Sequence, residues 1–195
     1  MYPQTKLKGD CSRMATDSEA TGVHLEEPRM EDRNSLLVAG LMKAYTEETS
    51  KEMPQLWREL APHIGKMPGQ VGRKAYGVIY NLSKTGDFAY LAGVEVSSAA
   101  DVPDDFNVVR IPDVSYAVFP HAGHVSNLKE TISAIWNEWL PASGLRPTRA
   151  DEEMPAIIEQ YGEGFDPATG AGDIEIWVPL KNRSRMITMV PTAEG

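Results

Sequence analysis

The order of the elements predicted along the chain constrains the fold most strongly, because one order occurs twice. A strand, an amphipathic helix and two further strands are predicted in the first half, and the same succession follows in the second half. The predicted strands are residues 35–42, 75–80 and 90–96, then residues 114–119, 157–161 and 173–180. Two units of the same order indicate an α+β protein made of two similar halves that face one another.

Each unit contains one helix, which is predicted from apolar residues at helical spacing. The two apolar stripes are Met53, Leu56, Trp57, Leu60 and Ile64, then Leu128, Ile132, Ile135, Trp136, Trp139 and Leu140. Pro54 is expected at the first helical position, where its missing N–H loses no hydrogen bond. Pro141 and Gly144 are expected to end the second helix. Residues 101–112, which contain two prolines, are predicted to be a loop.

Composition places the chain among globular proteins and argues against one class of partner. Its 195 residues suit one domain at residues 29–181, with a flexible extension at residues 1–28 and a tail at residues 182–195. The formal net charge of −9 argues against binding to nucleic-acid phosphates and permits attraction of cations. Cys11 is the only cysteine, and no segment resembles a signal peptide or a membrane span, so a cytoplasmic protein is expected.

A doubled pattern near the C-terminus suggests a function. Glu159 and Tyr161 stand two residues apart, and Glu175 and Trp177 repeat that spacing after a turn rich in glycine and proline. Residues i and i+2 of a strand point to the same face. If the two strands pair as a hairpin, two carboxylates and two aromatic rings share one surface. Such a surface suits an organic cation, which is attracted both by aromatic faces and by a carboxylate in an apolar setting.

The last strand alternates, and its polar face has two interpretations. One face holds Ile174, Ile176, Val178 and Leu180, and the other holds Asp173, Glu175 and Trp177. The aliphatic face is expected to pack on the helices. The polar face is either exposed to solvent, as is common for such strands, or the wall of a cleft. A large ring at Trp177 favours the cleft, because exposed rings usually have a function.

Other aromatic residues are weaker candidates for a binding site. Tyr76 lies on one face of its strand, which is either core or pocket wall. Trp57 and Trp136 are expected in the core, whereas Trp139 stands at the end of its helix, where a ring can reach a cleft.

Three other motifs point to no chemistry. His121 and His124 are loosely spaced and lack a defined third ligand, so neither a metal nor another cofactor is expected. The glycine-rich residues 65–72 match neither of the common phosphate-binding fingerprints and are expected to form a mobile loop. Ser143 does not lie in the elbow sequence of serine hydrolases.

Five blocks of the chain together resemble the GyrI-like small-molecule-binding family, which also supplies the effector-binding domain of AraC-type and MerR-type multidrug regulators. The blocks are residues 75–81 (AYGVIYN), 90–96 (YLAGVEV), 116–119 (YAVF), 135–141 (IWNEWLP) and 173–179 (DIEIWVP). The resemblance covers roughly residues 30–181. It implies an antiparallel sheet built from two strand–helix–strand–strand modules around a pseudo-twofold axis, with a ligand cleft between them.

The resemblance also implies which residues face the ligand. By motif position these are Glu159, Tyr161, Glu175 and Trp177. Weaker pocket candidates are Tyr76, Phe119 and Trp139. The family often has phenylalanine where this chain has Ile158, which would reshape the cleft. Residues 1–28 are too short for a helix-turn-helix domain, so a standalone member without direct contact to nucleic acid or membrane is expected.

Three functions are compatible with this resemblance. The first is binding of a lipophilic cation, with Glu159 and Glu175 as counter-charges. The second is hydrolysis of a strained electrophile, with Glu175 or Glu159 activating water and Tyr161 polarising the substrate. The third is inhibition of DNA gyrase or another protein partner through the acidic surface, and a homodimer is a further form that the sequence permits. One fold hosts several activities, so the resemblance alone does not choose among them.

Overall fold

In a computed structural model, residues 25–80, 83, 86–148 and 154–181 are described. The strands of this part of the chain are β1 (Arg29–Asp32), β2 (Leu36–Tyr45), β3 (Gln70–Tyr80), β4 (Phe88–Val96), β5 (Asn107–Ile111), β6 (Ser115–Pro120), β7 (Ile157–Tyr161) and β8 (Ile174–Pro179). The helices are α1 (Met53–Leu60), α2 (Leu128–Ala134) and α3 (Leu140–Ser143), with a π-helical segment (Ile135–Trp139) joining the last two. The expected tail and all but the last residues of the expected N-terminal extension lie outside the described residues.

The strands form one antiparallel sheet whose order confirms the two predicted modules. The order is β1-β6-β8-β7-β3-β4-β2-β5. β3 and β7 pair at the centre, β4 and β8 flank them, and β2 and β6 lie one step further out. The first module therefore occupies one half of the sheet and the second module the other. The boundary between the modules runs between β3 and β7.

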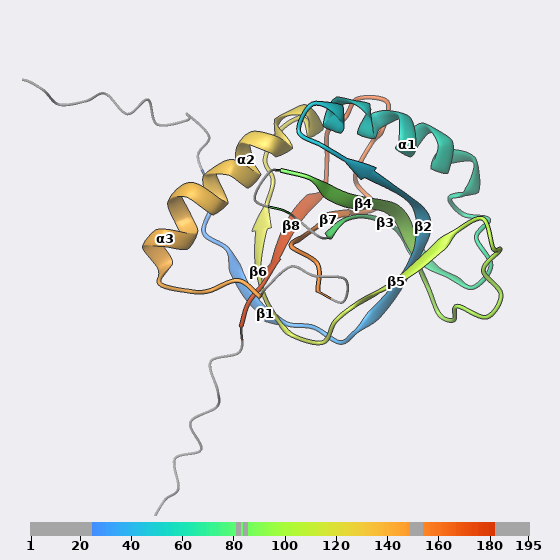
Figure 1. The fold of residues 1–195 in the computed structure, drawn as a ribbon, viewed down its shortest axis with the longest axis horizontal. Coiled ribbons are helices and arrows are strands. Elements are labelled where there is room, and N and C mark those ends of the chain that lie inside the picture. The colour runs from blue at the N-terminus through green and yellow to red at the C-terminus, as the bar shows by residue number, and fades with distance from the viewer. Residues whose placement is uncertain (1–24, 81–82, 84–85, 149–153, 182–195) are drawn as a thin grey trace, which may run out of the picture.

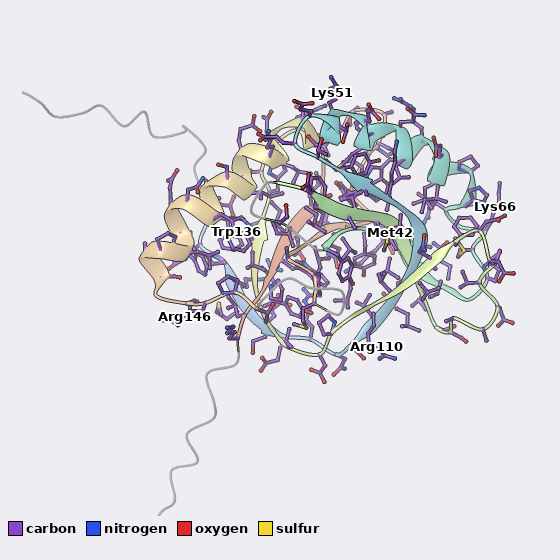
Figure 2. The ribbon with its side chains drawn as sticks, in the orientation of Figure 1. Met42, Lys51, Lys66, Arg110, Trp136 and Arg146 are labelled. Atoms are coloured by element: carbon purple, nitrogen blue, oxygen red, sulfur yellow. The ribbon has the colours of Figure 1, made fainter. Side chains whose placement is uncertain are left out.

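Both faces of this sheet are covered. The helices α1, α2 and α3 lie on the outer side of the curved sheet (Figure 1), where Leu56, Leu60 and Ile135 enter apolar clusters with the strands. On the inner side, side chains fill the space that the sheet encloses (Figure 2). This inner core draws residues from seven strands and contains Val38, Tyr76, Val78, Leu91, Ile111, Tyr116, Val118, Ile158 and Trp177. Curvature thus gives the sheet a second core without a second layer of helices.

Two edge strands and one strand start differ from the sequence predictions. β5 lies within residues 101–112, which were predicted to be a loop. Its neighbouring prolines are tolerated because β5 is an edge strand that pairs with β2 alone. β1 precedes the first predicted strand, residues 35–42, and pairs with β6 at the other edge. β3 begins at Gln70, inside the glycine-rich segment predicted to be mobile, and contains an irregularity before Ala75.

The second helix continues beyond the proline that was expected to stop it. Pro141 lies in the first turn of α3, and the helical path ends at Gly144, which has a left-handed φ of 66°. Before the proline the chain widens into the π-helical segment, where Leu140 N–H donates to the carbonyl of Ile135. A widened turn gives the proline ring room that a regular α-helix lacks. Pro54 does lie at the start of α1, as predicted.

None of the helices in the described part of the chain has the length and apolar character needed to cross a membrane.

Candidate functional site

The centre of the candidate site is a buried carboxylate on the central strand β7. Glu159 is 5% exposed, although it is an acidic residue. The Tyr90 hydroxyl donates to Glu159 Oε2 at 2.6 Å, and the Tyr161 hydroxyl donates to the same oxygen at 2.9 Å. A buried carboxylate is costly unless hydrogen bonds or positive charge compensate it. Here two tyrosines supply hydrogen bonds and the described residues supply no positive charge at hydrogen-bonding distance.

Strand alternation brings these groups to the helix-covered face of the sheet. Ile157, Glu159 and Tyr161 alternate on β7 with Ile158 and Gln160. Ile157 and Tyr161 belong to the apolar cluster under the helices, whereas Ile158 belongs to the inner core. The carboxylate therefore lies among aromatic and aliphatic side chains between the sheet and the helices.

Helix α1 contributes the next layer. Trp57 Nε1 donates to the Tyr90 hydroxyl at 3.0 Å. The Trp57 ring also meets the Tyr161 ring edge to face, with centroids 5.0 Å apart. Phe165, which follows β7, also packs against Tyr161, with ring centroids 4.9 Å apart. A chain of hydrogen bonds therefore runs from the indole through Tyr90 to Glu159.

Burial dominates the electrostatics of this group. Desolvation raises the pKa of Glu159 above 4.5, and the hydrogen bonds from Tyr90 and Tyr161 oppose this rise. Burial and the nearby carboxylate raise the pKa of both tyrosines well above 10.0. The two tyrosines therefore remain protonated donors at neutral pH, and the carboxylate is the group whose charge a ligand can stabilise.

The two glutamates of the doubled pattern lie on opposite faces of the sheet, which corrects the prediction of one shared surface. In the β7–β8 pairing, Glu159 is opposite Ile176, and Gln160 is opposite Glu175. Residues directly opposite in an antiparallel pair point to the same face. Glu175 and Trp177 therefore belong to the inner face, away from Glu159 and Tyr161. A shift of pairing by one residue decides this outcome, and the spacing within each strand contains no information about it.

Glu175 already has cationic partners from its own chain. Arg29 Nη2 lies 2.6 Å from Glu175 Oε1, and Arg33 Nη2 lies 3.7 Å from Oε2. Trp177 Nε1 donates to Glu175 Oε2 at 3.1 Å. Burial works to raise the pKa of Glu175, but the hydrogen bonds from Arg29 and Trp177 and the arginine charges outweigh it, so the pKa lies below 4.5.

A cation also occupies the face of Trp177. The guanidinium carbon of Arg33 lies 3.8 Å from the centroid of the Trp177 ring. The combination of carboxylate, ring and cation that the sequence predicted for a ligand is thus present on the inner face, with Arg33 as the cation.

The weaker candidates divide between the two faces. Tyr76 belongs to the inner core, where it packs against Trp177 at 6.0 Å and its hydroxyl donates to Glu95 at 3.4 Å. Of its two interpretations, the structure therefore favours core. Phe119 and Trp139 lie on the helix-covered face and meet edge to face at 4.9 Å. They belong to the same apolar cluster as Tyr161.

Four residues of the site were not predicted. Trp57 was expected to be core, Phe165 was not among the candidates, and Tyr90 and Gly77, which is paired with Glu159 on β3, were assigned only to strands. A signal for Gly77 is present in the sequence, because glycine inside a strand often marks a close approach of other groups. Tyr90 and Trp57 have no such signal, since a tyrosine in a strand and a tryptophan on a helical stripe are ordinary core residues.

The histidines near the start of α2 have a structural arrangement. His121 is buried, and its ring nitrogens lie 2.9 Å from Thr131 Oγ1 and 3.1 Å from the His124 carbonyl oxygen. Both ring nitrogens are thereby engaged in joining this turn to α2. Within the described residues, no group of three or more His, Cys, Asp or Glu side chains is placed to hold a metal ion.

Comparison with known proteins identifies what the chain is similar to. The sequence profile of the GyrI-like small molecule binding domain matches residues 26–181. The transcriptional regulator BrlR of Pseudomonas aeruginosa is 26% identical over 153 residues, which are 78% of this chain and 54% of BrlR. The chain thus spans about half the length of that relative.

Two solved structures share the fold. The structure of SAV2435 bound to tetraphenylphosphonium has a TM-score of 0.64 at 18% identity, over 80% of this chain and 95% of that one. A putative transcription regulation protein from Staphylococcus aureus MU50 has a TM-score of 0.58 at 18% identity, over 80% and 99% of the two chains. The profile match and these folds confirm the resemblance and the α+β class predicted from the sequence.

Proposed function

This chain belongs to the family of GyrI-like small-molecule-binding domains, and we propose that it binds a lipophilic organic cation against Glu159. The observation that carries the proposal is the buried Glu159 carboxylate, which has tyrosine hydroxyls beside it but, among the described residues, no cation. A cationic ligand would supply the missing positive charge in a setting of low polarity, where attraction between charges is strong.

The surroundings of Glu159 favour a cation that is large, aromatic and weakly hydrated. The Tyr161 hydroxyl donates to the carboxylate, and the rings of Trp57 and Phe165 pack against the Tyr161 ring. Each ring facing a cation contributes about 0.5–2 kcal/mol, depending on how far the cation is desolvated. A small ammonium ion would lose much of its hydration on entry, whereas a phosphonium with aryl groups is already shielded. SAV2435, which shares this fold, has been solved with tetraphenylphosphonium bound, and this supports the choice of ligand class.

The two glutamates have different parts in this proposal. Glu175 is paired with Arg29 and Arg33 on the inner face. A ligand cation would have to compete with two arginines there, whereas at Glu159 the described residues supply no competing cation. We therefore assign the counter-charge to Glu159 and a structural role to Glu175.

The test is calorimetric titration of the protein with tetraphenylphosphonium, supported by quenching of tryptophan fluorescence. Glu159→Gln keeps the size and the acceptor oxygen of the side chain but removes its charge. We expect it to weaken binding about tenfold or more, since each 1.4 kcal/mol of lost attraction is a factor of ten. The matched control is Glu163→Gln, because Glu163 is an exposed glutamate in the turn after β7. Equal affinity of Glu159→Gln and the unchanged protein, or equal affinity for neutral triphenylphosphine oxide, would contradict the proposal.

A second candidate function is hydrolysis, and the raised pKa of Glu159 favours it. A carboxylate whose pKa is raised by burial is a better base for water. Tyr161, which donates to this carboxylate, would then be placed to polarise a strained electrophile. Product formation that is lost in Glu159→Gln would establish this function. Saturable binding of such an electrophile without turnover would leave the binding function alone.

A further inference from the structure

The hydrogen bond between Tyr90 and Glu159 crosses a strand. Tyr90 lies on β4 and Glu159 on β7, and β3 runs between them in the sheet. On β3, Gly77 is directly opposite Glu159 on one side and Ala92 on the other. Tyr90 is paired with Ile79, so its side chain reaches diagonally over Gly77 to meet the carboxylate. The contact joins the two modules across their boundary.

Gly77 has no side chain that would block this contact. A Cβ atom built at Gly77 would lie 2.2 Å from the Tyr90 hydroxyl oxygen and 2.4 Å from Glu159 Oε2. Ordinary van der Waals contact begins at 3.4 Å, so both groups would have to move. They would move by about 1 Å, away from β3 and toward the helices.

Backbone conformation does not explain why glycine stands here. Gly77 is not among the glycines with positive φ, so its backbone conformation is open to any residue. Nor does close packing of strands explain it. A Cβ at Gly40 would lie 1.9 Å from a backbone carbonyl oxygen, whereas the three atoms nearest to a Cβ at Gly77 belong to the ends of the Tyr90 and Glu159 side chains. Glycine inside a strand also costs stability. Glycine at position 77 therefore allows the Tyr90 hydroxyl and the Glu159 carboxylate to meet directly over β3.

We infer that Gly77 determines the specificity of the Glu159 site, because it lets Tyr90 of the first module hold the carboxylate of the second module close to the sheet. This inference rests on the proposed function. With glycine at this position, the Tyr90 hydroxyl and the buried carboxylate both lie directly against β3. With alanine, the Tyr90 hydroxyl and the carboxylate are displaced toward Trp57 and Tyr161. This displacement lowers the affinity for a bulky cation more than the affinity for a small one.

The binding experiment compares Gly77→Ala with two other variants. Tyr90→Phe removes the hydroxyl without adding an atom at Gly77. Gly164→Ala is the control, because its added Cβ would meet only ordinary contact, at 3.4 Å from the Asp173 Cβ. We expect Gly77→Ala to weaken binding of tetraphenylphosphonium about tenfold, as for loss of a hydrogen bond to a charged group. We expect Gly77→Ala to weaken binding of the smaller tetraethylphosphonium clearly less. Gly164→Ala should change the affinity for neither ion.

A measurement without ligand separates this inference from the proposed function. The Trp57 indole N–H donates to Tyr90, so its proton resonance should shift in Gly77→Ala and in Tyr90→Phe but not in Gly164→Ala. Trp57→Phe assigns that resonance among those of the four tryptophans. If the unchanged protein does not bind tetraphenylphosphonium, the proposed function fails together with the ligand part of this inference. The Trp57 indole resonance then still decides whether Gly77 determines the position of the Tyr90 hydroxyl.

Three outcomes would overturn the inference. The first is a Gly77→Ala protein with unchanged affinities, whatever its indole resonance. The second is equal weakening for the two phosphonium ions. The third is a Gly77→Ala protein that does not fold by circular dichroism, because the clash would then reach beyond movable side-chain ends. A loss that is larger for the bulkier ion, together with a shifted Trp57 resonance, would support it.

Discussion

The two faces of the central sheet each hold a glutamate, but in opposite electrostatic environments. On the helix-covered face, Glu159 is buried with tyrosine hydroxyls, and burial raises its pKa. On the inner face, Glu175 is paired with Arg29 and Arg33, and its pKa is lowered. Both glutamates stand two residues before an aromatic ring. The two glutamates therefore differ in the groups that compensate their charge, and this difference is the basis for proposing Glu159 and not Glu175 as the binding carboxylate.

The largest expected difference between the faces is in affinity for tetraphenylphosphonium. Glu159→Gln should weaken binding about tenfold or more, while Glu175→Gln should change it less than about threefold, because only the first removes an uncompensated charge. Calorimetric titration of both variants at one salt concentration measures this. A greater loss in Glu175→Gln would place the ligand on the inner face and reverse the comparison.

The next difference is in the sign of the change in stability. Glu175→Gln should lower the free energy of unfolding by about 1 kcal/mol, because it leaves Arg29 and Arg33 with Glu31 as their one remaining carboxylate partner among the described residues, in a partly exposed network. Glu159→Gln should leave this free energy unchanged or raise it, because it removes a buried charge while its amide oxygen still accepts from the tyrosines. Urea unfolding of the ligand-free proteins at neutral pH tests both signs. Loss of stability in both variants would show that the tyrosines alone compensate Glu159.

The pH dependence of stability should also differ between the two variants. The pKa of Glu159 is raised in the folded state, so folding takes up a proton and the unchanged protein loses stability as pH rises through the raised pKa. The free energy of unfolding of Glu159→Gln should therefore rise relative to that of the unchanged protein above pH 4.5, which is the ordinary pKa of a glutamate. The pKa of Glu175 is lowered, so its contribution is present above pH 4.5 and is lost as pH falls through the lowered pKa.

Urea unfolding at several pH values, from about pH 3 to pH 8, measures both trends. Glu163→Gln, which alters an exposed glutamate, serves as the control and should follow the unchanged protein. Parallel curves for Glu159→Gln and the unchanged protein would mean that folding does not alter the pKa of Glu159.

The smallest expected difference concerns one hydroxyl on each face. The Tyr90 hydroxyl lies 2.6 Å from Glu159, and the Tyr76 hydroxyl lies 3.4 Å from Glu95. Tyr90→Phe should lower affinity for the cation several-fold, whereas Tyr76→Phe should leave affinity unchanged and alter the free energy of unfolding by about 0.5 kcal/mol. Titration and urea unfolding of the two variants provide the comparison. An effect of Tyr76→Phe on affinity would show that the two faces communicate.

The fold could be predicted from the sequence because its signals are local. Alternation, helical stripes and turn residues specify the two modules one element at a time. β5 was missed because its short apolar run stands between Pro103 and Pro112, which are also typical of a loop. Pro141 was misjudged because the widening of the helix before it depends on packing as well as on the sequence nearby.

The site could be predicted only in part, because it depends on pairing between distant strands. Glu159 and Tyr161 were identified through their spacing within one strand. Whether they share a face with Glu175 depends on the register of β7 against β8. That register cannot be deduced from the sequence of either strand alone. The contact of Tyr90 with Glu159 depends on the order β4-β3-β7 and on the empty position at Gly77. Such contacts are visible only once the strands are placed side by side.

The hydrogen-bonded group around Glu159 has two members from each half of the chain: the donors Trp57 and Tyr90 from the first, and the donor Tyr161 with the accepting carboxylate from the second. Neither half contains the complete hydrogen-bonded group. Under the proposed function, a protein cut between β4 and β5 would regain its affinity for an organic cation only when the two fragments reassociate, so the same domain could serve as a split reporter.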